Sequence, residues 1–249
     1  MLNTLSQPGP PGAPHLVIVH GLFGSARNWG AIAKRMSDAF SVTSVDMRNH
    51  GESPRADTQS YFDMAGDLAD MLDGSAHIVG HSMGGKAAMV LALTRPELVD
   101  RLVVADIAPV AYSHTQMPMI DAMRAIDLNE VSTRGDADRQ LQAHVEDPDV
   151  RAFLLQSLDV KSRSWRLNLD VLASEMDKIL GFPDISATFK GPTLFLTGSE
   201  SDYVGRDDRA GIKALFPKAR FASVTGAGHW LHADKPREFE ASLRVFLGA

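Results

Sequence analysis

A stretch of five residues, Gly80 to Gly84, constrains the fold more than any other part of the chain. It reads Gly-His-Ser-Met-Gly, follows the apolar segment 76–79 and precedes the helix-like segment 85–93. A strand that turns this sharply into a helix brings the backbone close to itself, so Cβ atoms do not fit at either glycine. The turn therefore pushes the Ser82 hydroxyl outward, beside helix N–H groups that favour negative charge. Ser82 is the candidate nucleophile; the alternative is a glycine-rich turn with a solvated serine.

Strand and helix patterns alternate on both sides of this turn. Continuous apolar runs are typical of strands covered on both faces, and they occupy residues 15–20, 40–46, 76–79, 101–106, 192–197 and 220–224. Helical patterns separate them at residues 28–36, 61–72 with Ser60 as the cap, 85–93, 207–216 and 236–247. The order predicts an α/β fold with a mostly parallel sheet flanked by helices. Residues 1–14 are rich in Pro and Gly and are expected to form a leader before the first strand.

The pattern changes between Ile107 and Ile185. Strand signals stop, and amphipathic helices are indicated at residues 119–126, 131–145, 149–158 and 167–180. A helical insertion of this length between strands of one sheet is often a lid over an active site. We predict a core of residues 1–107 and 186–249, with residues 108–185 as a helical cap inserted after the strand that ends at Asp106. The alternative is a purely structural subdomain.

Composition excludes several classes of function. The 249 residues carry a net charge of −6 without a local Lys/Arg cluster, which argues against a nucleic-acid or anionic-membrane surface. Cysteine is absent, so disulfides and thiol catalysis are excluded. No His, Asp and Glu spacing suggests a metal site, and no metal or cofactor is expected. With no signal peptide or membrane-spanning stretch indicated, we expect a cytoplasmic protein, and the oligomeric state stays open.

The base and the acid are sought at one edge of the sheet, because the carboxyl ends of parallel strands converge there. A nucleophilic serine needs an imidazole to take its proton and a carboxylate to orient that imidazole. Of the nine histidines, only His229 lies in a Gly-rich loop after the last strand. His20 and His81 are expected to pack or to bond to backbone, His50 belongs to a turn, and His232 starts or precedes the closing helix. Asp106 and Asp202 both follow strands and are the candidate acids.

Five motifs in this order resemble the α/β-hydrolase superfamily, and more narrowly its bacterial YbfF-type esterases. They are His20-Gly21-Leu22-Phe23-Gly24-Ser25, Asp46-Met47-Arg48-Asn49-His50-Gly51, Gly80 to Lys86, Asp106-Ile107-Ala108-Pro109 and Gly228-His229-Trp230. The resemblance covers nearly the whole chain. It implies a serine esterase or thioesterase acting on a small-molecule ester or acyl thioester such as acyl-CoA, with a helical cap and no cofactor.

The resemblance also implies roles for individual residues. The oxyanion hole would be the backbone N–H groups of Leu22 and Met83. Many members of the superfamily place the acid in a Gly-x-x-Asp motif after the cap, but that position is Ser201 here and the carboxylate comes one residue later, at Asp202. YbfF-type esterases use the aspartate of Asp-Ile-Ala-Pro, so we expect Asp106 to be the acid and keep Asp202 as the alternative.

Other assignments depend on side-chain directions that a sequence does not give. Phe23, Tyr112, Trp165 and Trp230 are candidates for the substrate pocket, although aromatic residues beside a cap are often core. Lys86 lies inside the helix after the turn, where a structural role is the more common one. The same fold and triad also serve peptidases, lactonases and carbon–carbon hydrolases, and the fold can act as a ligand receptor without turnover.

Overall fold

The computed structural model describes residues 1–249 and contains a seven-stranded sheet in the order β1-β3-β2-β4-β5-β8-β9. The strands are β1 Thr4–Gln7, β2 His15–Val19, β3 Ser41–Val45, β4 Ala76–His81, β5 Val99–Ala105, β8 Thr193–Gly198 and β9 Ala219–Val224. The pairs from β3 to β9 are all parallel. The predicted α/β fold with a mostly parallel sheet is confirmed, and each predicted strand lies within two residues of an observed one.

The first strand corrects the sequence prediction, which treated residues 1–14 as a leader. Strand β1 pairs antiparallel with β3 at the edge of the sheet, with Thr4 opposite Val45 and Gln7 opposite Val42. Residues 4–6 are exposed, so no apolar run marks this strand in the sequence. Its stabilisation comes from backbone pairing at an edge, which hydrophobic patterning does not report.

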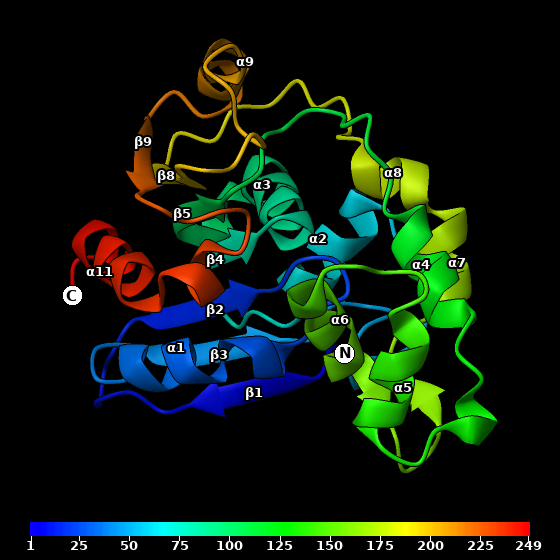
Figure 1. Cartoon of the computed structure of the whole chain (residues 1–249). Helices are drawn as coiled ribbons and strands as arrows, with labels where there is room; N and C mark the ends of the chain where they lie inside the picture. The colour runs from blue at the N-terminus through cyan, green and yellow to red at the C-terminus, as the bar shows by residue number, and fades with distance from the viewer.

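Helices cover both faces of the sheet (Figure 1). One face carries α1 (Gly30–Met36) and α11 (Pro236–Leu247), and the other carries α2 (Tyr61–Asp70), α3 (Met83–Thr94) and α9 (Asp208–Leu215). Successive residues of a strand serve opposite faces: Val17 of β2 packs into the α2–α3 side and Ile18 into the α1–α11 side. This two-sided burial is the physical origin of the continuous apolar runs. The Ser60 hydroxyl caps α2 by accepting a hydrogen bond from the Asp63 N–H at 3.2 Å, as expected.

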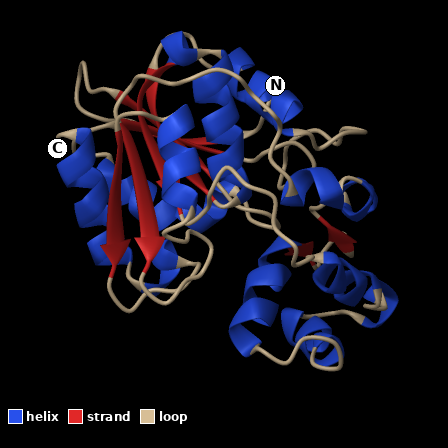
Figure 2. Cartoon of the chain, turned by 90° about the horizontal axis from the view of Figure 1, so that it is seen from above, coloured by secondary structure: helices blue, strands red, loops and turns tan.

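The segment between β5 and β8 forms a separate group of helices beside the sheet (Figure 2). It contains α4 Met117–Arg124, α5 Arg134–Leu141, α6 Pro148–Leu154, α7 Leu169–Ser174 and α8 Met176–Leu180, with a hairpin of β6 Leu158–Asp159 and β7 Ser164–Trp165. We call residues 108–185 the insertion. The helix expected over 167–180 is two helices that meet at Glu175, and the hairpin is too short to leave a strand pattern. Short helical segments complete the chain at Ala26–Trp29, Pro96–Leu98, Leu128–Glu130, Leu155–Ser157 and Leu231–Asp234. None of the helices combines the length and apolar character needed to cross a bilayer.

The helix α3 provides a test of the packing. A Cβ atom at Gly84 would collide with the backbone of Val19 and His20, whereas one at Gly66, inside α2, would meet nothing within 4 Å. We expect Gly84→Ala to lower the free energy of unfolding by roughly 2–3 kcal/mol, because neither neighbour is a flexible side chain. The control Gly66→Ala should raise it by about 0.5–1 kcal/mol. Urea unfolding followed by circular dichroism measures both, and equal effects would contradict this account of the turn.

Candidate active site

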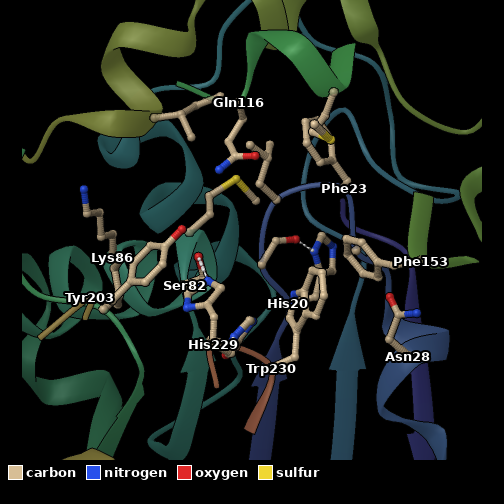
Figure 3. Close-up of a pocket in the computed structure, with 18 of the residues that line it drawn as sticks. His20, Phe23, Asn28, Ser82, Lys86, Gln116, Phe153, Tyr203, His229 and Trp230 are labelled. Carbon is tan, nitrogen blue, oxygen red and sulfur yellow. Dashed lines mark hydrogen bonds between the residues drawn. The ribbon is translucent and has the colours of Figure 1, made fainter. Parts of the chain in front are cut away.

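Ser82 occupies the turn between β4 and α3 in a strained backbone conformation. Its φ and ψ are 52° and −120°, in a region that a non-glycine residue rarely adopts. The neighbouring glycines make the turn possible, because a Cβ at Gly80 would collide with the Gly84 carbonyl. The side chain is thereby presented to a cavity on the carboxyl side of the sheet (Figure 3).

A chain of hydrogen bonds runs from Ser82 through His229 to Asp106. The His229 Nε2 atom lies 3.1 Å from the Ser82 Oγ atom, and its Nδ1 atom lies 2.8 Å from Asp106 Oδ2. Since Asp106 is an acceptor, the proton sits on Nδ1 and Nε2 faces the serine hydroxyl. Ser82 follows β4, Asp106 follows β5 and His229 lies in the loop after β9, so all three lie at one edge of the sheet. The arrangement is suited to removing the serine proton.

The Asp106 carboxylate is completely buried and is held by two further donors. The Gly198 N–H donates to Oδ1 at 3.0 Å, and the Ser201 hydroxyl donates to Oδ2. Burying a carboxylate is costly unless hydrogen bonds compensate, and here both oxygens have partners. Asp202 is exposed, and no hydrogen bond or ion pair joins it to His229, whose carboxylate partner is Asp106. The residue at the superfamily's usual acid position, Ser201, thus supports the carboxylate that contacts His229.

His229 is held on its ring and on its backbone. The Tyr203 ring stacks on the imidazole, with 3.8 Å between ring centroids and 16° between planes. The His81 Nε2–H donates to the His229 carbonyl oxygen at 2.8 Å. Sequence reasoning missed Tyr203 and Ser201 as parts of the site. The only signal was their place in the loop after β8, where the superfamily motif falls.

The candidate oxyanion amides lie beside Ser82. Met83 is the first residue of α3, whose first-turn N–H groups lack acceptors within the helix. Leu22 lies in the loop after β2 and, like Met83, borders the cavity. Two histidines fix this loop: His20 Nδ1–H donates to the Gly21 carbonyl at 2.7 Å, and His50 Nε2 accepts from the Phe23 N–H at 3.3 Å.

Four histidines around Ser82 are kept neutral. Burial and, to a smaller extent, a neighbouring histidine lower the pKa of His50 and of His232 to about 3. Burial also lowers the pKa of His81 well below its usual value, and it lowers that of His20. Charging any of them would mean burying an unpaired cation. His20, His50 and His81 therefore act as fixed, neutral hydrogen-bonding groups, as their contacts with backbone indicate. His232 instead stacks on the Trp29 ring, and its Nδ1 atom has no hydrogen-bond partner.

A cavity of about 490 Å³ lies above Ser82, between the sheet edge and the insertion. Fifteen of its 28 lining residues are hydrophobic, so the space favours apolar groups. Of the expected pocket residues, Phe23, Tyr112 and Trp230 line this cavity. Trp165 is not among the residues that line this cavity: its ring is buried within the insertion, and its Nε1–H donates to the Met123 carbonyl at 3.1 Å.

The insertion contributes lining residues that the sequence did not single out. They include Gln116, Met119, Val150, Phe153 and Ile179. The Phe153 and Trp230 rings lie 5.4 Å apart at one side of the cavity (Figure 3). No group of three or more His, Asp or Glu side chains is arranged to hold a metal ion.

Comparison with known proteins places this geometry in context. A sequence model of the alpha/beta hydrolase fold matches residues 14–236. The sn-1-specific diacylglycerol lipase ABHD11 of Mus musculus is 45% identical over 94% of this chain and 81% of its own length. Esterase YbfF of Escherichia coli is 40% identical over 93% of this chain and 92% of its length. The solved structure of a marine microorganism esterase is 38% identical in sequence and superposes with a TM-score of 0.93. The superposition covers 98% of this chain and 98% of that one.

The hydrogen-bond chain predicts the reactivity of Ser82 toward a fluorophosphonate. We expect the reagent to label Ser82 in the wild-type protein. In Asp106→Asn the labelling rate should fall by a factor of about 10³–10⁴, because His229 loses the carboxylate that sets its tautomer. The matched variant Asp202→Asn should label at the wild-type rate. Peptide mass spectrometry over a time course measures both. Similar modest losses in the two variants would contradict the assignment of Asp106.

Proposed function

Because the chain belongs to the α/β-hydrolase family, we propose that it is a serine hydrolase that cleaves carboxylic esters through an acyl-enzyme on Ser82. One observation carries the proposal, namely the continuous contact from Asp106 through His229 to Ser82 at the floor of an apolar cavity. The names of its relatives, which are esterases and a lipase, support the same reaction class.

The proposed reaction begins when His229 Nε2 takes the Ser82 hydroxyl proton and the Oγ atom attacks the ester carbonyl carbon. Asp106 stabilises the imidazolium that forms. His229 then gives the proton to the departing alcohol, which leaves the acyl group on Ser82. In the second half, His229 takes a proton from water, the hydroxide attacks the acyl carbonyl, and the proton returns to Ser82.

The backbone N–H groups of Leu22 and Met83 would hold the negative oxygen of both tetrahedral intermediates. Because they are backbone donors in a fixed loop and at a helix start, they need little rearrangement as charge develops. Loss of one such donor typically lowers kcat by about 10²–10³. The contacts of His20 and His50 with this loop support the preorganisation that the proposal requires.

The lining of the cavity favours a substrate whose acyl group carries no charge. Its only lysine, Lys86, is bound to backbone carbonyls, and its one carboxylate, Asp234, accepts from the Gly228 N–H. Acyl thioesters such as acyl-CoA would present the same carbonyl to Ser82 with a thiol leaving group. We include them in the proposal as a second substrate class.

We further propose that the insertion, residues 108–185, is a cap that closes the acyl site. It supplies Met119, Phe153 and Ile179 to the cavity wall, opposite the strand edge that carries the reacting groups. Apolar walls on both sides would exclude water from the acyl group while leaving the carbonyl at Ser82.

Hydrolysis of a series of p-nitrophenyl esters tests the proposal. We expect activity that peaks at one acyl length among acetate, butyrate, octanoate and dodecanoate, because the cavity has a fixed size. The matching acyl-CoA thioesters are measured in parallel, and Ser82→Ala should abolish turnover of every substrate. A folded wild-type protein that labels at Ser82 but hydrolyses none of these compounds would point to a narrower hydrolase, and one that neither labels nor hydrolyses would point to a receptor.

A further inference from the structure

Lys86 is a buried lysine without a carboxylate partner. It lies in α3 one turn after Ser82, and its backbone N–H donates to the Ser82 carbonyl at 3.1 Å. The residue is 1% exposed, although lysine is rarely buried unless it is paired. Its Nζ atom ends away from the Ser82 hydroxyl (Figure 3). The proposed chemistry leaves it without a role.

The Lys86 ammonium instead binds three backbone carbonyls in the two segments that join the insertion to the core. Its Nζ lies 2.8 Å from the carbonyl oxygen of Val110, on the segment that enters the insertion. It lies 2.8 Å from that of Leu180 and 2.6 Å from that of Gly181, on the segment that leaves it. An ammonium group has three N–H donors, so each donor has one acceptor.

These two segments also bind each other at the same place. The Tyr112 N–H donates to the Leu180 carbonyl at 3.1 Å, and the Tyr61 hydroxyl of α2 donates to the Ile179 carbonyl at 2.6 Å. The Lys86 Nζ lies 4.7 Å from the centre of the Tyr112 ring and 5.7 Å from that of Tyr61. The last carbonyl groups of α8 have no N–H donors within the helix. The Lys86 ammonium, the Tyr112 N–H and the Tyr61 hydroxyl supply the missing hydrogen bonds.

The same residues form part of the cavity wall. Tyr112, Ile179 and Leu180 line the space above Ser82, and Lys86 itself borders it. A shift of the two crossing segments would therefore move the wall that faces the acyl group. The nucleophile's own helix carries the residue that holds this wall in place.

We propose that Lys86 is a positioning residue, which fixes the insertion over Ser82 by binding both of its crossing segments at once. Its effect on catalysis rests on the proposed ester hydrolysis, but the attachment itself does not. The residue sets the shape of the acyl site without touching the reacting atoms. Longer acyl groups, which extend to the crossing segments, depend on it more than short ones.

The attachment depends on the charge of Lys86. Burial lowers its pKa to about 7, and the facing groups, Tyr61 and Tyr112, are uncharged because burial raises the pKa of both phenols. Above pH 7 the amine loses a proton, keeps two donors for three carbonyls and turns a lone pair toward an oxygen. The attachment is thus complete below about pH 7 and weakens as the pH rises.

Two variants test the attachment without relying on activity. Lys86→Met keeps much of the side-chain volume and removes all donors. The control Lys178→Met removes an exposed lysine of α8 that pairs with Glu175, the residue before that helix. We expect amide hydrogen exchange at Tyr112 and in residues 176–182 to rise about tenfold in Lys86→Met and to stay unchanged in Lys178→Met. Unchanged exchange in a folded Lys86→Met protein, or an equal rise throughout the core, would overturn the proposal.

Substrate length gives the functional readout. The ratio of kcat/KM for p-nitrophenyl octanoate to that for the acetate should fall about tenfold in Lys86→Met, mainly through KM, and should not change in Lys178→Met. In the wild type this ratio should decline from about pH 6 to about pH 9, because Lys86 loses its proton over that range. Titration of the reacting groups affects both substrates equally and therefore cancels in the ratio. This second arm still decides the matter if Lys86→Met fails to fold: a flat ratio would contradict the proposal. Absence of any ester hydrolysis would refute the proposed function, and the exchange comparison would then test the attachment alone.

Discussion

The turn at Ser82 is the constraint on which the rest of the site depends. A positive φ at a non-glycine residue costs about 1–3 kcal/mol and persists only where the surroundings enforce it. Here the enforcement is close contact: Gly80 faces the Gly84 carbonyl, and Gly84 faces the backbone at the end of β2. The same contact places the start of α3 against the loop that carries Leu22. One packing arrangement therefore sets the serine and the two candidate oxyanion amides together.

The buried Asp106 follows from the topology of the sheet. A parallel sheet places the ends of β4, β5 and β9 at one edge, so residues distant in the sequence meet without long side chains. Asp106 itself has a φ of 54°, and its carboxylate receives hydrogen bonds from Gly198, Ser201 and His229. These donors offset the cost of burying the charge and leave His229 with one orientation.

The core of the fold could be predicted because it is encoded in local patterns. Two-sided burial leaves apolar runs, and the glycines around Ser82 identify the turn before its angles are known. Strand β1 could not be found, because an exposed edge strand is stabilised by backbone pairing. The position of Trp165 away from the cavity above Ser82 could not be predicted either, since helical and apolar patterns do not say whether an aromatic ring of the insertion faces its own core or the substrate.

The roles of Asp106 and Lys86 could not be predicted from local sequence patterns. Residue properties left Asp106 and Asp202 both open, and only a resemblance favoured the first. The partners of Lys86 lie 24, 94 and 95 residues away in sequence, so nothing near it in the chain indicates them. Both cases depend on which backbone segments cross the sheet edge, and that information comes with the tertiary structure.

In the proposed reaction the acyl group passes through a covalent ester on Ser82. Rapid acid quenching of the enzyme during turnover of a p-nitrophenyl ester, followed by peptide mass spectrometry, tests it directly. We expect an acyl mass on the peptide that contains Ser82, formed at the rate of the first burst of p-nitrophenol. Steady hydrolysis with neither a burst nor any acylated Ser82 peptide, in an enzyme whose deacylation has been slowed by low temperature, would contradict it.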